Sequence, residues 1–481
     1  MSRKALLLAI AFFAFLPTLG NGFVNYDDNR CLTQNPRILH PSPENFLKLL
    51  IEPQEGLNNP MVYVTYAVEY AFFGLNPLAY HTTHLILHLL NILLVFGILT
   101  KLRLRPTVVF IAALLFAVHP IQVETVAWIS NRKDLLYSVF YLASLRFYLN
   151  SLDQPNSRVY LASLGLFQLS ILSKAMAVSL PVVLWLIHRS FYPRRPVPWA
   201  RLVPFILISG LSCVLTLAKH PAASAPAVAF VPLLKFIDVC YAPLFYLSKL
   251  FWPTGLCVLY PLPKSLGILP PLYLYAPFII AAGGYALFHF RKTPLLLFGA
   301  AFYLVSLLPV LPFFNFNSII VADRYAYLPS IGIFMLVGQG LDRPAFKSLL
   351  KTFGCVLIAV LCVITFRVSG SWFNSQTLFD RVLTFYPYTA LAYLKRGDFF
   401  FEQGQYDRAG ADYDQAIALS PFGMPMAYHN RAVVLFYKEE YLKALAYFER
   451  AILFDEARET SSVQDKAELM RVMRAKGMKL A

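Results

Sequence analysis

The sequence predicts an all-α protein in two parts: a polytopic membrane domain of about 11 transmembrane helices and a C-terminal helical-repeat domain. Of the 481 residues, 58% are hydrophobic and 14% are charged, whereas a soluble domain averages about 25% charged residues. The charge is also unevenly spread. Residues 372–481 hold 14 basic and 14 acidic residues, but residues 1–371 hold 28 basic and only 12 acidic ones.

This composition excludes a soluble enzyme, a disordered chain and a collagen-like fibre. The basic excess of the first part does not indicate nucleic-acid binding either, because its basic residues punctuate apolar runs. A nucleic-acid surface needs basic residues interleaved with aromatic ones on an exposed face. We therefore take residues 1–371 as the membrane domain and residues 372–481 as the second domain.

Eleven apolar runs approach the roughly 20 residues that a spanning helix needs. The predicted spans are residues 4–20, 79–101, 106–119, 134–150, 158–174, 175–189, 201–218, 273–290, 294–312, 326–341 and 347–367. The run 230–252 is also apolar, but it contains prolines and charged residues, so we interpret it as half-inserted or interfacial. A secretory signal peptide is the alternative for the first run, which lacks a clear cleavage site.

Charge counting predicts the orientation of the membrane domain. With eleven spans and the N-terminus inside, the inner side receives 16 basic and two acidic residues, against 12 basic and ten acidic outside. This bias has the sign of the positive-inside rule. It places the first outer loop, about residues 21–78, and the C-terminal domain outside the cytoplasm. We expect a bacterial inner membrane, with the periplasm as the outer side.

The sequence of the second domain predicts tetratricopeptide repeats. Each such repeat is a pair of helices, and the repeats recur every 34 residues. From Ala390, small and aromatic residues recur at the expected offsets, and a second copy follows 35 residues later. The matching positions are Tyr393, Gly397, Phe400, Ala409, Tyr413, Ala416 and Pro421, then Tyr428, Ala432, Leu435, Ala444, Phe448 and Ala451. We predict repeats over about 390–423 and 425–458, a half-repeat over 372–387 and a capping helix over 460–481.

Two adjacent carboxylates, Asp27 and Asp28, come directly after the first span. A carboxylate at a membrane edge can have a raised pKa and act as a general base. The alternative is a polar turn, which Asp and Asn residues favour.

Histidines mark the start of the second span. His81, His84, His88 and Asn91 share one helical face because their spacing is 3, 4 and 3 residues. Buried polar groups in a membrane usually face the protein interior, so these residues either bind a ligand or bond to each other. No carboxylate is fixed near the histidines, and we predict no metal.

A third polar element is the short stretch 117–134, which contains His119, Glu124, Arg132 and Asp134. Lys174 lies at the outer end of a later span, and Asp323, Arg324 and Tyr325 lie at the outer start of the tenth. Arg and Lys at a dry membrane edge suit a phosphate group. Internal salt bridges are the alternative. The sequence has no P-loop and no Rossmann glycine pattern, which leaves ATP-driven transport and nucleotide-sugar chemistry unsupported.

Five segments together resemble the transmembrane-and-tetratricopeptide-repeat O-mannosyltransferases and their bacterial relatives, which are C-type glycosyltransferases (GT-C). These segments are 23–28 (FVNYDD), 74–81 (GLNPLAYH), 117–134 (AVHPIQVETVAWISNRKD), 171–174 (ILSK) and 323–330 (DRYAYLPS). Family members often carry an acidic residue directly after the Ser-Lys pair, where this chain has Ala175.

The resemblance implies a membrane glycosyltransferase that moves a sugar, mannose, from a polyprenyl (dolichyl) phosphate to an acceptor hydroxyl with inversion. The expected acceptor is a protein Ser or Thr or a glycan, which the repeats are expected to hold, and no cofactor or metal is expected to be obligatory. Asp27 or Asp28 is the expected base, with Asp27 favoured, and Arg132, Lys174 and Arg324 are expected to bind the donor phosphate. Further site candidates are His81, His84, His119, Glu124, Asp134, Asp323 and Tyr325. A non-catalytic scaffold that recruits partners through its repeats, and a lipid-linked glycan ligase or transporter, are the alternatives.

The predicted orientation can be tested at Gln403. In a chain whose native cysteines are replaced, Gln403→Cys should react with a membrane-impermeant thiol reagent in intact cells or spheroplasts, because the predicted topology puts the repeats outside the cytoplasm. Labelling only after lysis would contradict both the topology and the outer placement of the candidate site.

Overall fold

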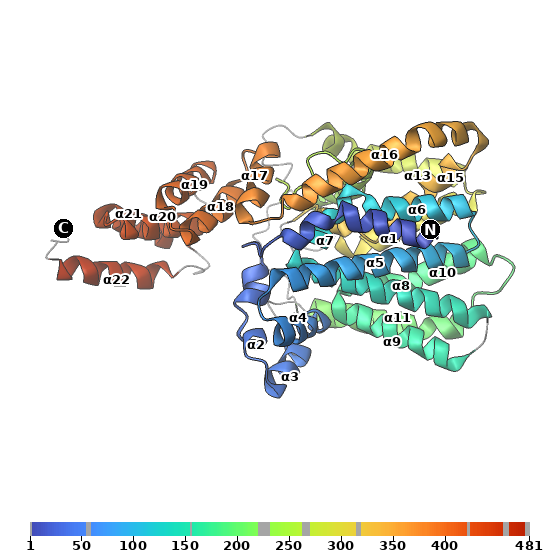
Figure 1. Ribbon diagram of the computed structural model, residues 1–481, viewed down its shortest axis with the longest axis horizontal. Helices are drawn as coiled ribbons and strands as arrows, with labels where there is room; N and C mark the ends of the chain where they lie inside the picture. Colours follow the sequence, from blue (N-terminus) through green and yellow to red (C-terminus); the bar gives the residue numbers. More distant parts are fainter. Residues whose placement is uncertain are drawn as a thin grey trace. The chain divides into compact units, whose positions relative to one another are not determined.

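The computed structural model describes residues 2–53, 59–153, 156–219, 231–261, 270–313, 319–420, 424–455 and 461–476. Every regular element in these ranges is a helix (Figure 1), so the all-α prediction is confirmed. The chain divides into two compact units. The larger unit comprises Met1–Gly22, Asp27–Val258 and Leu262–Trp372, and the smaller one comprises Phe23–Tyr26, Leu259–Pro261 and Phe373–Ala481.

The larger unit is a bundle of long helices joined by short ones. Many of its helices begin at a proline, whose fixed φ and missing N–H suit the first helical position. The helices are α1 (Arg3–Ala14), α2 (Pro36–Leu39), α3 (Pro43–Ile51), α4 (Pro60–Phe73), α5 (Pro77–Lys101), α6 (Pro106–Val118), α7 (Val123–Ala127), α8 (Arg132–Asp153), α9 (Ser157–Ser173), α10 (Leu180–Phe191), α11 (Trp199–Lys219), α12 (Val231–Phe251), α13 (Pro271–His289), α14 (Pro294–Leu307), α15 (Ser330–Leu341) and α16 (Pro344–Gly370).

Four helices within the described ranges are long and apolar enough to cross a membrane: Pro77–Lys101, Trp199–Ala218, Pro271–His289 and Phe353–Gly370. A fifth is possible if Pro106–Val118 and Pro120–Ala127, which meet at a bend of 50°, form one broken span. Each of the eleven predicted spans contains a helix, but most of these helices are too short or too polar to qualify. The structure thus supports a membrane protein, and the count of about 11 spans is not confirmed.

The run 230–252, expected to be half-inserted or interfacial, forms a continuous helix of 21 residues, α12, with Pro243 inside it; residue 230 lies outside the described ranges. Its partners come from other parts of the bundle. Tyr273, near the start of α13, donates its hydroxyl to Asp238 (2.7 Å), and His119 bonds to the carbonyl of Leu250 (3.0 Å). Tyr273 and His119 thus hold α12 within the larger unit.

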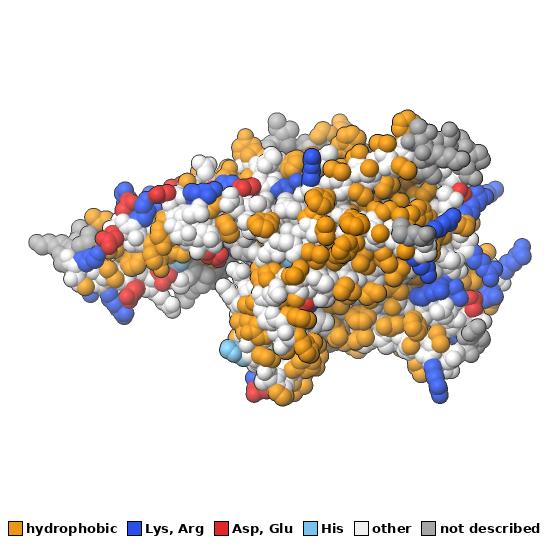
Figure 2. All heavy atoms as spheres, viewed as in Figure 1, with side chains coloured by type: hydrophobic (Ala, Val, Ile, Leu, Met, Phe, Trp, Pro, Cys, Tyr) orange, Lys and Arg blue, Asp and Glu red, His pale blue; other side chains and the backbone are white. Residues whose placement is uncertain are grey.

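One end of the larger unit collects basic residues. Arg3 contacts the carbonyl of Pro106 (3.3 Å), Lys101 pairs with Asp153 (2.5 Å) and Arg105 pairs with Asp342 (2.9 Å), so the ends of five helices meet there. Figure 2 shows Lys and Arg gathered at this basic end, beside the N-terminus, with a largely hydrophobic surface between it and the other end. The opposite end of the bundle, where α5 begins and α6 ends, carries the candidate site. We call it the motif end.

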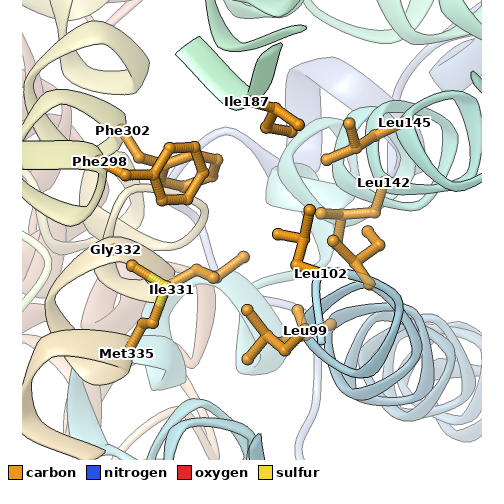
Figure 3. Close-up of a pocket in the computed structure, with 12 residues that line it drawn as sticks. Leu99, Leu102, Leu142, Leu145, Ile187, Phe298, Phe302, Ile331, Gly332 and Met335 are labelled. Atoms are coloured by element: carbon orange, nitrogen blue, oxygen red, sulfur yellow. The ribbon is translucent and has the colours of Figure 1, made fainter. Parts of the chain in front are cut away.

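A narrow cavity lies inside the bundle between α5, α8, α10, α14 and α15 (Figure 3). Its lining is entirely apolar, with Leu99 of α5 and Leu102, just after the end of α5, facing Phe298 and Phe302 from α14. No lining side chain could orient a sugar or a phosphate. We therefore treat this cavity as a packing void in the core.

The smaller unit is a stack of helical hairpins. Its helices are α17 (Ser375–Phe385), α18 (Ala390–Glu402), α19 (Tyr406–Leu419), α20 (Pro425–Tyr437), α21 (Tyr441–Phe454) and α22 (Ser462–Ala475). The small residues predicted from the repeat pattern let the paired helices approach closely. A Cβ on Gly397 would lie 2.7 Å from Cε1 of Tyr413, and Ala409 is fully buried. Pro421, one of the predicted repeat positions, lies outside the described residues.

A piece of the predicted first outer loop belongs to the smaller unit. The backbone N–H of Asn25 donates to the Ser375 hydroxyl (2.9 Å), and the Asn25 side chain donates to the carbonyl of Lys395 (2.8 Å). Tyr26 packs edge-on against Phe379, with ring centroids 6.3 Å apart. The chain thus passes through the repeat unit immediately before Asp27.

Candidate active site

The motif end is built from short helices that replace ordinary loops between the long ones. After α6 ends at Val118, Pro120 starts a 3₁₀ turn (Pro120–Gln122), which is followed by α7 and by a second 3₁₀ turn (Ile129–Asn131). The side chain of Gln122 donates to the Ser330 hydroxyl at the start of α15 (3.1 Å). This compact path buries nearly all of the stretch 117–134, so its charged residues need partners inside the protein.

The two adjacent aspartates have different environments. Asp28 is buried, and its carboxylate accepts hydrogen bonds from the backbone N–H of Ser130 (3.0 Å) and from the Ser130 hydroxyl. Asp27 is exposed and adopts φ of +71°. Left-handed backbone at a residue other than glycine costs free energy and often marks a functional site. Asp28 therefore ties the first outer loop to the motif stretch, whereas Asp27 is open to a substrate.

Arg132 lies in a buried ion pair. Its Nη1 is 2.5 Å from Oε2 of Glu69 in α4, and the side chains of Arg132 and Glu69 are 1% and 7% exposed. The Thr83 hydroxyl donates to the other carboxylate oxygen of Glu69 (2.6 Å). The Arg132 guanidinium also lies over the rings of Tyr66 and Tyr80, 4.4 and 5.5 Å from their centroids. Arg132 thus fastens α8 to α4, and a donor phosphate could not reach it in this arrangement.

Lys174 and Arg324, the other two predicted phosphate ligands, are brought together around Tyr325. Lys174 pairs with Asp134 (Nζ to Oδ1, 2.5 Å), and its ammonium lies 5.1 Å from the centre of the Tyr325 ring. The side chain and the backbone N–H of Arg324 both donate to Glu124, and its guanidinium lies 4.9 Å from the Tyr325 ring centre. The sequence-predicted candidates Glu124, Asp134 and Tyr325 are therefore direct neighbours of the predicted cations. Asp323, also a candidate, is buried at the start of the same 3₁₀ turn (Asp323–Ala326).

Lys133 is a cation that the sequence analysis did not single out. Its side chain is only partly buried, and its ammonium lies 6.0 Å from the ring centre of Trp128, which Arg324 also approaches (5.3 Å). Burial raises the pKa of the Tyr325 phenol, but Arg324, Lys174 and Lys133 outweigh burial and lower it. This lowered pKa indicates a positive electrostatic potential at Tyr325, as an anion site requires.

Lys133 and the aspartate pair both act on the Cys31 thiol. Burial raises the pKa of this thiol, Lys133 opposes the rise, and Asp27 and Asp28 add to it. Lys133 also helps to lower the pKa of Tyr325. We call Lys133, Lys174, Arg324 and Tyr325 the cation cluster.

The predicted histidine candidates bond to backbone groups. His81 contacts the carbonyl of Gly22 (3.5 Å), and His84 contacts that of Val126 (3.3 Å). His119 accepts from the backbone N–H of Ile121 (3.2 Å), while its other ring nitrogen bonds to the carbonyl of Leu250. These contacts hold loops of the motif end in place. Among the described residues, no three His, Cys, Asp or Glu side chains come together as metal ligands.

The sequence analysis did not identify two important residues, Glu69 and Lys133. Glu69 is the only acidic residue of α4, and a lone carboxylate in an apolar helix is a signal that could have found it. Lys133 is adjacent to Arg132, and no feature of the sequence distinguishes their roles. Ala175, where an acidic residue was expected, is exposed at the start of the 3₁₀ turn Ala175–Ser179, so Asp134 is the carboxylate that pairs with Lys174 here.

Both the repeats and most of the whole chain match known proteins. Residues 390–422 and 427–458 match the tetratricopeptide repeat family, which confirms the predicted repeats. A protein O-mannosyl-transferase of Caenorhabditis elegans is 25% identical over 453 residues, which cover 86% of this chain and 62% of the relative. The protein O-mannosyl-transferase TMTC3 of Homo sapiens is 23% identical over 483 residues, covering 88% and 52%. The chain resembles the protein O-mannosyl-transferases along most of its length.

A shorter match has higher identity. Over 157 residues the chain is 31% identical to a protein O-mannosyl-transferase of Xenopus laevis, covering 31% of this chain and 19% of the relative. The resemblance predicted from the five motif segments is therefore confirmed. The chain spans between about half and three fifths of the length of the Caenorhabditis elegans and human relatives.

The buried ion pair predicts a stability effect that separates Arg132 from Lys133. Glu69→Gln leaves the Arg132 charge buried without its partner, which should lower the free energy of unfolding by about 3–5 kcal/mol. Lys133→Ala, the control at the adjacent and partly exposed position, should change it by less than about 1 kcal/mol. Thermal unfolding of the detergent-solubilised full chain measures both. Equal melting temperatures for Glu69→Gln and the unchanged protein would show that the pair has no structural role.

Proposed function

We propose that the protein is a membrane mannosyltransferase that transfers a sugar from a polyprenyl-phosphate donor to an acceptor hydroxyl on the extracytoplasmic side. The observation that carries this proposal is the hydrogen bond from the backbone of Ser130, in the motif stretch, to Asp28. This bond places the exposed Asp27 at the same end of the bundle as Lys174 and Arg324, which lie around the ring of Tyr325. Glycosyl transfer needs both parts: a base for the acceptor and positive charge for the leaving phosphate. The names of the relatives support the mannosyl-transfer chemistry.

In the proposed reaction, Asp27 takes the proton from the acceptor hydroxyl. The hydroxyl oxygen then forms a bond to the anomeric carbon while the bond from that carbon to the phosphate oxygen breaks, and the configuration inverts. The electron pair leaves with the polyprenyl phosphate. Asp28, held by Ser130, positions the segment that carries Asp27 and does not itself remove the proton. This division of roles follows from the exposure of Asp27 and the burial of Asp28.

Lys133, Lys174 and Arg324 supply positive charge for the leaving phosphate in this proposal. Preorganised cations in a site with little water stabilise developing negative charge strongly, because solvent does not screen them. Glu124 and Asp134 hold Arg324 and Lys174 in place. Lys133 replaces Arg132 among the predicted phosphate ligands, because Arg132 is buried against Glu69. No metal and no cofactor has a role in this scheme.

We further propose that the motif end and the repeats face the periplasm of a bacterial inner membrane and that the repeats hold the acceptor protein. The gathering of Lys and Arg at the basic end supports this orientation under the positive-inside rule. Stacked helical repeats commonly bind extended peptide segments. A non-catalytic scaffold would use the same repeats but would not depend on Asp27, so the variants of the aspartates distinguish the two functions.

The roles of the two aspartates predict unequal effects of conservative variants. Asp27→Asn removes the base but keeps the size of the side chain, so it should reduce transfer about 10²–10⁴-fold at normal protein abundance. Asp28→Asn should reduce transfer less, because the amide can still accept a hydrogen bond from Ser130. The measurement is transfer of label from radiolabelled polyprenyl-phosphate mannose to protein in membranes. Full activity of both variants would remove the base from this loop and favour the scaffold.

The cation cluster predicts an effect on donor use. Lys133→Ala should raise the KM for the donor because a charged hydrogen bond of about 1.5–3 kcal/mol is lost, which corresponds to roughly 10- to 100-fold. Lys443→Ala in α21 is the control, since its side chain is 72% exposed and lies in the repeat unit. The same transfer assay, run at varied donor concentration, gives both values. An unchanged donor KM in Lys133→Ala would exclude Lys133 from the phosphate site.

A further inference from the structure

Helix α3, in the first outer loop, has one face covered with exposed apolar side chains. Phe46, Leu47, Leu50 and Ile51 are all exposed, with exposed fractions of 55% for Leu47 and 67% for Ile51. They fall into two i, i+4 pairs and therefore share one side of the helix. Glu44 and Lys48, which form an ion pair with each other (2.5 Å), lie across the helix from Phe46 and Leu50 and border the apolar side next to Ile51. Helix α3 is thus amphipathic, yet its apolar side is not turned into the protein.

Helix α4 continues this apolar surface. Val68, Phe72 and Phe73 are exposed, and Phe72 has an exposed fraction of 77%. An open groove runs between the two helices, lined by Phe46, Leu47 and Leu50 of α3 and by Ala67, Val68 and Ala71 of α4. Soluble proteins rarely expose a contiguous apolar surface of this kind unless it is an interaction site.

Helix α4 cannot turn this face inward, because two buried contacts fix its rotation. Glu69 pairs with Arg132, and the Tyr66 hydroxyl donates to the backbone carbonyl of Ile129. Both contacts lie on the side of α4 that faces the motif end. Val68 and Phe72 share a stripe of the helix beside these contacts, and the fixed rotation holds both of them exposed.

The exposed surface is continuous with that of a membrane span. Only a short turn separates the end of α4 at Phe73 from the start of α5 at Pro77, and both Leu75 and Leu78 in this region are exposed. Along α5, which is apolar and long enough to cross a membrane, Ile86 and Leu90 are exposed as well. The exposed apolar surface thus extends from α5, a candidate membrane span, onto α4 and α3. Figure 1 shows α3 and α4 at the end of the larger unit away from the N-terminus.

We propose that α3 and α4 lie in the bilayer interface on the side of the motif end, with the exposed apolar face of the pair inserted among lipid acyl chains. An amphipathic helix binds a membrane in this way when its polar face stays in the headgroup region, and Glu44 and Lys48 provide that face. The partner is the lipid of one leaflet. Insertion fixes the depth of the first outer loop, and through the Glu69–Arg132 pair it also fixes the depth of the motif end. The inference does not depend on the transfer reaction.

Single cysteines on the two sides of α3 test the proposal. Phe46→Cys and Leu50→Cys on the apolar side, and Glu44→Cys as the matched control across the helix from them, are made in the cysteine-free full chain. Each carries an environment-sensitive fluorophore and is reconstituted into phosphatidylcholine vesicles that contain nitroxide-labelled acyl chains. Phe72→Cys reports on α4, and Leu90→Cys in α5 is the reference for a lipid-facing position.

We expect the labels at 46, 50 and 72 to emit at shorter wavelength and to be quenched by the nitroxide lipids to nearly the extent seen at 90. The label at 44 should instead be quenched several-fold more by aqueous iodide than the label at 46. Equal iodide quenching at 44 and 46, without quenching by nitroxide lipid, would overturn the proposal in favour of a surface in water. Protection at 46 from both quenchers would also overturn it, because a second copy of the chain or another protein would then cover the face.

Discussion

Glu69 and Arg132 form an ion pair that is almost completely removed from solvent, and the geometry of the motif end depends on it. A charge buried without a partner costs several kcal/mol, so neither side chain tolerates loss of the other. The rings of Tyr66 and Tyr80 surround the guanidinium, and Tyr66 also bonds to the backbone of the motif stretch. One contact therefore sets the position of α4 in the first outer loop and the start of α8. Asp134, in the first turn of α8, in turn pairs with Lys174.

Adjacent residues at the motif end differ in their roles because they differ in their contacts. Asp28 uses its carboxylate to hold Ser130, and Arg132 uses its guanidinium to hold Glu69. Their neighbours Asp27 and Lys133 remain at least partly exposed. Each pair thus consists of one residue that stabilises the fold and one that is available for chemistry. In the proposed transferase, Asp27 is the base and Lys133 is a phosphate ligand. Asp28 and Arg132 hold these two neighbours in position.

The larger unit separates its charges along its length. Basic residues gather at one end, where Arg105 pairs with Asp342 and Lys101 with Asp153, and the motif end holds its charges in buried pairs. The surface between the ends is largely hydrophobic (Figure 2). A bilayer favours this distribution because charged side chains are costly in hydrocarbon and inexpensive in the headgroup region. The exposed apolar faces of α3 and α4 extend the hydrophobic surface at the motif end, which is where a lipid-linked donor would be presented.

The sequence by itself determined the features that depend on composition and local spacing. The apolar content and the long apolar runs predicted a helical membrane protein, and the recurring small and aromatic residues predicted the repeats, because a helix pair needs a small residue such as Gly397 wherever Tyr413 packs against it. The motif segments also identified Asp27, Lys174 and Arg324 as candidates.

Only the tertiary structure decided which residues pair. Glu69 and Arg132 are far apart in the chain, and Lys133 differs from Arg132 only by a rotation of about 100° at a helix start. The number of spans also could not be read from apolar runs, because several of these runs fold into short or bent helices. Hydropathy measures the apolar content of a segment, whereas length and direction in a bundle are set by the contacts that the segment makes.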